Sequence, residues 1–261
     1  MSAVDLISLC TVRLTGYRKY DDGTKTGKSV MSGFIWRNDG ADFLITNWHN
    51  VTGLHPDSEE PIGSFTPTHF CCEYKAVKND DQSIASGTVD LSLYNNEENP
   101  KWIEHPQGRL IDVVAIPFYD DDLPDNYDLL ALNEQDFQKD WNPRIGSEGF
   151  IVGYPEGFSG PLTTPIWKRG SVSTEPSLDH QEKPMFLVDT IGNKGLSGSC
   201  VIGRSSGIFM KGGKLTGTEI IGTWENFIGI YSGRVSDEGI GSQLGRVWKA
   251  SVLEEIFSLL A

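Results

Sequence analysis

The stretch SGFIWRNDGADFLITNWHNV, residues 32–51, holds two short apolar runs on either side of the turn signal NDG. Runs of this length, rich in β-branched and aromatic residues and separated by Asn, Asp and Gly, predict a β-hairpin. The second run ends in ITN, and His49 follows almost at once at a turn. This stretch therefore predicts a β fold in which a histidine stands at the end of a strand.

Similar strand-length runs recur along the chain in two series, with turn signals between them. The first series is LISLCTVRL (6–14), SVMSGFIW (29–36), DFLITNW (42–48), THFCCEYKAV (68–77), TVDLSLY (88–94) and IDVVAIPF (111–118). The second series is GFIVGY (149–154), IWKRGSVS (166–173), MFLVDT (185–190), SCVIG (199–203), TEIIGTW (218–224) and FIGIYSGRV (227–235). Two sets of about six strands predict an all-β protein of two small barrels.

The chain divides at an acidic stretch, residues 119–147, which has prolines near both ends and little hydrophobic alternation. Such a stretch is typical of an interdomain connection. We therefore expect a first barrel over residues 1–118 and a second over residues 148–242.

The chain closes with apolar residues four apart, which predicts one amphipathic α-helix over residues 243–261.

The charge balance excludes several kinds of partner. The chain has 22 Lys and Arg against 36 Asp and Glu, a formal net charge of −14, and no basic block. Because phosphate backbones attract basic surfaces, we expect no nucleic-acid partner.

No apolar run approaches the roughly 18 residues of a membrane helix, and the first residues lack the basic and apolar regions of a signal peptide. We therefore expect no membrane association.

The cysteines indicate a reducing compartment. There are four, and Cys71 and Cys72 are adjacent, which fits neither a disulfide framework nor a zinc ribbon. Neighbouring residues on a strand point to opposite faces, so this pair cannot bind one zinc ion together with His69. We therefore expect a cytoplasmic protein without a bound metal.

Three residues have the types and settings that catalysis by a serine hydroxyl needs. Such catalysis uses a base, a carboxylate that orients the base, and backbone N–H groups at the developing oxyanion. His49 follows a strand, Asp112 begins the apolar run DVVAIPF, and Ser197 lies in the glycine-flanked turn GLSGS. Asp90 is the competing carboxylate, but it lies inside its run and is followed by polar Ser92. The order of the three residues across both halves predicts a catalytic triad.

In order and context these motifs resemble the chymotrypsin-like serine peptidases, and among them the bacterial trypsin-like peptidase-domain and HtrA-type proteases. The resemblance covers nearly the whole chain and rests on SGFIW…FLITNWHNV, WIEHP before DVVAIPF, FIVGYPEGF, PIWKRGSVSTEP, DTIGNKGLSGSCV, GIYSGRV and the closing helix. It implies a double six-stranded antiparallel β-barrel with the active site between the barrels. It also implies hydrolysis of peptide bonds in a protein or peptide substrate, without a cofactor.

The resemblance implies a role for each residue of the site. His49 is the general base, Asp112 its orienting carboxylate and Ser197 the nucleophile. The backbone N–H groups of Gly195 and Ser197 form the oxyanion hole. A serine endopeptidase that acts through an acyl-enzyme intermediate is therefore the expected function.

The same resemblance assigns four residues to substrate binding. The strand IYSGR lies antiparallel to the substrate and offers backbone hydrogen bonds from Ser232 and Arg234. Ile191 forms the pocket wall six residues before the nucleophile, and Lys194 and Arg234 add positive charge at the rim. Small or aliphatic side chains are therefore expected before the cut, with acidic ones second.

Leu196 is a departure from the secreted relatives, which have an aspartate directly before the nucleophile that pairs with a freed N-terminus. Activation by N-terminal cleavage is therefore not expected.

Two other functions stay open. One is a latent protease module that an unknown partner protein or effector activates by ordering the glycine-rich loop TIGNKG. The other is a catalytically inactive peptide-binding fold, against which the intact His, Asp and Ser set argues.

Overall fold

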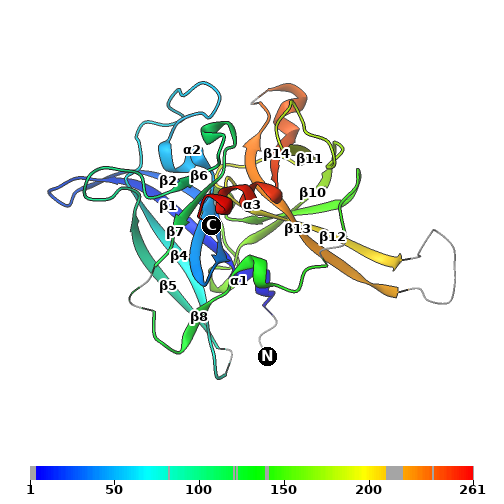
Figure 1. The fold of residues 1–261 in the computed structure, drawn as a ribbon, viewed down its shortest axis with the longest axis horizontal. Coiled ribbons are helices and arrows are strands. Elements are labelled where there is room, and N and C mark those ends of the chain that lie inside the picture. Colours follow the sequence, from blue (N-terminus) through cyan, green and yellow to red (C-terminus); the bar gives the residue numbers. More distant parts are fainter. Residues whose placement is uncertain are drawn as a thin grey trace.

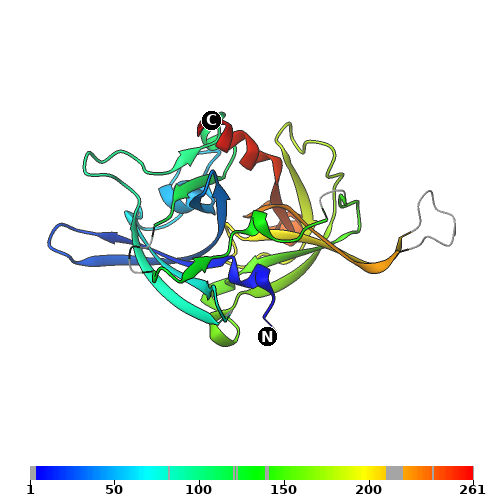
Figure 2. The same ribbon diagram turned by 60° about the horizontal axis from the view of Figure 1, so that its bottom comes forward.

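The computed structural model describes residues 4–81, 83–119, 121, 123–138, 141–209, 220–236 and 238–260. Two β units make up most of the molecule and lie side by side (Figures 1 and 2). The start of the predicted run TEIIGTW, at 218 and 219, lies outside the described residues. None of the helices in the described ranges has the length and apolarity that a membrane crossing needs.

The first unit is an antiparallel sheet with the strand order β5-β4-β1-β2-β3-β7-β6, and β8 pairs with β4. Six of its eight strands contain the apolar runs of the first half of the chain, and the short β6 and β8 are additions that no run indicated. The strands are β1 (Thr11–Lys19), β2 (Lys25–Asn38), β3 (Ala41–Thr46), β4 (His69–Lys78), β5 (Ile84–Ser92), β6 (Ile103–Glu104), β7 (Val114–Pro117) and β8 (Tyr127–Leu129).

The second unit is a closed barrel with the strand order β10-β11-β14-β13-β12-β9. Its strands are β9 (Glu148–Gly153), β10 (Ile166–Val172), β11 (Met185–Asp189), β12 (Cys200–Phe209), β13 (Ile220–Arg234) and β14 (Leu244–Lys249). Strands β12 and β13 continue beyond the barrel as a two-stranded hairpin (Figure 1). The predicted all-β class is confirmed, with a closed six-stranded antiparallel barrel, a second sheet and a C-terminal helix. The first of the two predicted six-stranded barrels is instead an eight-stranded sheet.

The end of the chain is a strand followed by a helix, and not one long helix. Leu244–Lys249 form β14, which pairs with β11 and β13 and closes the barrel. Helix α3 covers only Ser251–Phe257, and a 3-10 turn, η7, follows over Ser258–Leu260. The predicted helix start at 243 is therefore wrong, because a spacing of four residues fits the period of a strand as well as that of a helix.

Short helices and turns connect the strands. They are α1 (Leu6–Leu9), α2 (Trp48–Thr52), η1 (Gly108–Leu110), η2 (Leu132–Glu134), η3 (Pro155–Gly157), η4 (Pro161–Thr163) and η6 (Gly239–Gln243). Helix α1 replaces the start of the strand predicted at 6–14, because the Asp5 carboxylate accepts the Ile7 N–H at 3.0 Å and caps a helical turn. The predicted connection at 119–147 also contains β8, which belongs to the first sheet.

Apolar side chains fill the junction between the two units. Phe34 and Ile45 of the first sheet lie in one buried cluster with Val152 and Ile230 of the barrel. Helix α3 packs on the same cluster and lies across the junction in Figure 2; its buried residues are Val252, Leu253, Ile256 and Phe257. The burial of this apolar surface holds the ends of the first-sheet strands against the barrel.

A buried histidine links α3 to the first unit and predicts a stability that depends on pH. His105 is 2% exposed; its Nδ1 accepts the Gln107 N–H at 3.1 Å, and its Nε2 lies 3.0 Å from Glu255 Oε2 on α3. Burial lowers the pKa of His105, and Glu255 only partly offsets this effect. A lowered folded-state pKa means that stability is full above the ordinary histidine pKa of about 6.5 and is lost as the pH falls below it.

We therefore expect the melting temperature to fall between about pH 7.5 and about pH 5.5. In His105→Gln, which does not titrate there, the fall should be smaller, although the variant starts from a lower melting temperature. Thermal unfolding followed by circular dichroism at both pH values measures this. An equal fall in the variant and in the wild type would show that other groups cause it.

Candidate active site

His49 and Asp112 are brought together by neighbouring strands. Strand β3 ends at Thr46 and pairs there with Val114, the first residue of β7. His49 follows the end of β3 and Asp112 precedes the start of β7, so the two residues lie near each other. His49 Nδ1 lies 2.7 Å from Asp112 Oδ2, and the backbone N–H of His49 donates to Asp112 Oδ1 at 2.9 Å. Because a carboxylate only accepts hydrogen bonds, Nδ1 carries a proton, and in the neutral imidazole Nε2 is then the acceptor.

Further donors fix the carboxylate of Asp112 in its buried position. The side chain is 1% exposed, and Ser232 Oγ donates to the Asp112 Oδ2 atom at 2.6 Å. Asn47 Nδ2 donates to the backbone carbonyl of Asp112 at 2.7 Å. Hydrogen bonds to a buried carboxylate compensate for its lost hydration and hold its orientation.

The hydroxyl of Ser232 is a part of the candidate site that the sequence did not indicate. The family resemblance assigned only backbone atoms of Ser232 to the site, for pairing with substrate. The side chain instead contacts Asp112, 120 residues earlier in the chain. No spacing within the sequence relates two residues that far apart, so no local signal marks this contact.

Ser197 lies where the barrel meets the first sheet. Its carbonyl accepts hydrogen bonds from the N–H of Ser32 at 2.9 Å and from Asn50 Nδ2 at 3.2 Å, and both donors belong to the first unit. The next residue, Gly198, donates its N–H to Tyr231 of the barrel at 2.9 Å. Ser197 is half-buried, and its Oγ has no hydrogen-bond partner among the described residues. Catalytic hydrogen bonds of this kind often tighten only when substrate binds.

The three carbonyl groups just before Ser197 are all hydrogen-bonded. Lys194 O accepts from Glu156 N at 2.6 Å, Gly195 O from Ser32 Oγ at 2.7 Å, and Leu196 O from Ser199 N at 3.0 Å. In a trans peptide the N–H points away from the carbonyl, so the N–H groups of Gly195 and Ser197 face away from these partners. Within the described ranges neither N–H has an acceptor. Two such donors are what an oxyanion hole requires.

Most of the predicted site residues line one groove of about 720 Å³. They are His49, Asp112, Lys194, Ser197, Ser232 and Arg234. Gly195 lines a second groove of about 500 Å³, which shares His49, Ile62, Lys194 and Ser197 with the first. Ile191 is the exception, because it is 68% exposed and is not among the residues that line either groove.

Tyr231 fills the space beside the loop that precedes Ser197. It is fully buried, and a methyl group built on Gly192 would overlap its hydroxyl and lie 2.6 Å from Arg234 Cγ. Burial raises the pKa of Tyr231 to about 12, although the guanidinium groups of Arg234 and Arg246 act in the opposite direction. The phenol is therefore neutral near pH 7, and its hydroxyl fills the space against Gly192.

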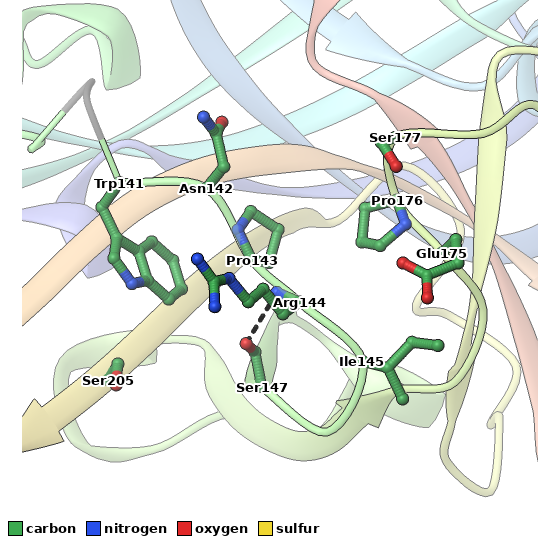
Figure 3. Close-up of a pocket in the computed structure, with 10 residues that line it drawn as sticks. All are labelled: Trp141, Asn142, Pro143, Arg144, Ile145, Ser147, Glu175, Pro176, Ser177 and Ser205. Atoms are coloured by element: carbon green, nitrogen blue, oxygen red, sulfur yellow. Dashed lines mark hydrogen bonds between the residues drawn. The ribbon is translucent and has the colours of Figure 1, made fainter. Parts of the chain in front are cut away.

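A larger hollow, of about 930 Å³, lies on another part of the barrel surface. Its walls come from residues 141–145, 147 and 175–177 together with Ser205 (Figure 3). None of the predicted site residues lines it. Size alone therefore does not mark the candidate site, whereas the convergence of His49, Asp112 and Ser197 does.

No family model matches the chain, and no curated protein matches it. The fold and the site therefore define the molecule as an all-β protein with a closed six-stranded antiparallel barrel and a second sheet, compatible with a trypsin-like fold.

Proposed function

We propose that the protein is a serine endopeptidase that hydrolyses peptide bonds through an acyl-enzyme intermediate. One observation carries the proposal: the paired His49 and Asp112 and the hydroxyl of Ser197 line one groove. The adjoining groove shares His49 and Ser197 and also contains Gly195, and the N–H groups of Gly195 and Ser197 have no acceptor in the described chain. The resemblance of the motifs to chymotrypsin-like peptidases supports the same reaction. The substrate is a protein or peptide, and no cofactor takes part in the proposed chemistry.

In the first half of the proposed reaction, Ser197 Oγ attacks the carbonyl carbon of the scissile bond while His49 Nε2 removes its proton. The carbonyl oxygen becomes negatively charged and accepts hydrogen bonds from the N–H groups of Gly195 and Ser197. Asp112 stabilises the imidazolium that forms, because its Oδ2 lies 2.7 Å from Nδ1. The imidazolium then protonates the leaving amine, and the acyl group stays on Ser197.

In the second half, water takes the place of the leaving amine. His49 Nε2 removes a proton from that water as the oxygen attacks the acyl carbon, and the same N–H groups stabilise the second oxyanion. The imidazolium returns the proton to Ser197 Oγ as the ester bond breaks. The serine and histidine are thereby regenerated, and the products are a carboxylate and the amine released earlier.

Covalent labelling tests the proposal directly. A fluorophosphonate probe should label the wild type at neutral pH and should not label Ser197→Ala, because the probe reacts with an activated serine hydroxyl. Ser199→Ala is a matched control, since the Ser199 Oγ is buried and has no hydrogen-bond partner among the described residues. That control should be labelled like the wild type.

Other outcomes distinguish the competing functions. Labelling that persists in Ser197→Ala would assign the reaction to another residue and overturn the proposal. Labelling only after a cell extract or purified partner is added would support the latent protease module. Binding of peptides by a chain that no probe labels would support the inactive peptide-binding fold.

A further inference from the structure

The backbone around Gly195 is held from two sides. Gly195 has φ +92°, and a glycine can turn the peptide planes on either side of it at little steric cost. The carbonyl before it, that of Lys194, accepts the backbone N–H of Glu156 at 2.6 Å. The carbonyl of Gly195 itself accepts the hydroxyl of Ser32 at 2.7 Å. Because each peptide unit is planar, one hydrogen bond on each side of Gly195 fixes the direction of its N–H.

The hydroxyl of Ser32 is buried between three segments of the chain. Ser32 lies on β2 of the first unit and is 0% exposed. Its oxygen accepts the N–H of Tyr154, the residue after β9, at 2.9 Å. A serine hydroxyl has one proton to donate, and here that proton goes to the carbonyl of Gly195. The hydroxyl therefore joins β2 to the turn after β9 and to the loop before Ser197.

The backbone of Ser32 holds the next residues of the same loop. Its N–H donates to the carbonyl of Ser197 at 2.9 Å, and its own carbonyl accepts the hydroxyl of Thr46 at 2.9 Å. A methyl group built on Gly198 would collide with the Ser32 carbonyl, so the loop passes very close to β2. Leu196 is fully buried in an apolar cluster of the barrel. The loop is thus anchored to both units.

We propose that Ser32 is a positioning residue, whose hydroxyl keeps the Gly195 N–H directed at the oxyanion. The inference rests on the proposed peptidase function, in which this N–H stabilises the charge that develops on the scissile carbonyl. Without the hydroxyl, the peptide after Gly195 loses that hydrogen bond, and the N–H points elsewhere for part of the time. A residue of the first unit thereby controls a donor that belongs to the barrel.

Ser32→Ala tests the proposal on a peptide that the wild type cleaves. Its kcat should fall at least about tenfold, yet by less than the about 10²- to 10³-fold loss of a missing oxyanion donor, because the N–H stays available part of the time. Its KM should change less than about threefold, since the donor acts on the transition state rather than on the bound substrate. A merely structural residue would not divide kcat from KM in this way.

Ser8→Ala is the matched control. The Ser8 hydroxyl is also buried, and it accepts the indole N–H of Trp167 at 2.8 Å, which joins α1 to β10. Both variants remove one buried hydroxyl that links the N-terminal half of the chain to the barrel, so both should lower the melting temperature. Because Ser8 lines neither groove at Ser197, it should keep the kcat of the wild type.

The amide resonance of Gly195 gives a second readout that does not depend on activity. In protein labelled with ¹⁵N-glycine, the spectrum of Gly195→Ala identifies this resonance by its loss. The wild type should show one sharp peak. Ser32→Ala should show a broadened or doubled one, because the peptide then exchanges between orientations. The amide of Gly40, in the turn between β2 and β3, should be the same in both proteins.

The inference and the proposed function can fail separately. Wild-type kcat in a folded Ser32→Ala overturns the inference while probe labelling of Ser197 stands. If the alanine variant does not fold, Ser32→Cys takes its place, because a thiol has a similar shape and is only a weak donor. A wild type that cleaves no peptide and reacts with no probe overturns the function. The spectra then still decide the inference, since an unchanged Gly195 resonance in the Ser32 variant shows that the hydroxyl does not hold this peptide.

Discussion

Replacing Asp112 with asparagine is expected to lower kcat by about 10⁴-fold without unfolding the protein. In the wild type Oδ1 accepts the backbone N–H of His49, and Oδ2 accepts from the His49 ring and from Ser232. An asparagine keeps only one accepting atom, so its NH2 must face at least one of these donors. If it faces the ring, Nδ1 becomes the acceptor and Nε2 carries the proton. The imidazole can then no longer deprotonate Ser197.

Asp90→Asn is the matched control for this variant. Asp90 was the competing carboxylate in the sequence, but it lies on β5 and pairs with Lys25 at 2.9 Å, with 44% of its side chain exposed. Its substitution should leave kcat unchanged. Peptide hydrolysis and thermal unfolding measured on both variants check the prediction. Wild-type kcat in Asp112→Asn, with the fold retained, would exclude the assigned role of the carboxylate.

Replacing Gly195 with alanine is expected to lower kcat by about 10²- to 10³-fold, the usual loss when one oxyanion donor is misplaced. Gly195 has φ +92°, and an added Cβ would lie 2.5 Å from Tyr154 O and 2.8 Å from Glu156 N. Both atoms are backbone, so they cannot move without their loop. A turn of the peptide between Lys194 and Gly195 would relieve this strain, and it would move the N–H away from the oxyanion.

Gly40→Ala separates this effect from backbone strain alone. Gly40 has φ +79°, close to that of Gly195, but a Cβ there meets no atom within 4 Å. The control should lose about 1 to 2 kcal/mol of stability through its left-handed backbone and keep its kcat. Rates on one peptide and melting temperatures for both variants measure the two effects. A Gly195→Ala variant with the kcat of Gly40→Ala would contradict the role of its N–H.

The chain pattern predicted the β class and the site residues, but it did not separate strand from helix at the end of the chain. Leu244 and Trp248 are four residues apart, which satisfies both periods. The tertiary structure favours a strand, because Leu244–Lys249 pair with both β11 and β13 and supply the backbone hydrogen bonds that close the barrel. Such a requirement depends on neighbours that are distant in sequence, so a local window does not contain it.

The same reasoning applies to the candidate site. The sequence alone identified the candidate residues, because a strand end before His49, an apolar run after Asp112 and glycines around Ser197 are local features. Only the tertiary structure decided how they are held, through the Ser232 hydroxyl on Asp112 and the Ser32 contacts at Gly195 and Ser197. It also decided that Ile191 lies outside the grooves and that cations line one of them. Hydrogen bonds and charges act through space, and the folded chain sets those distances.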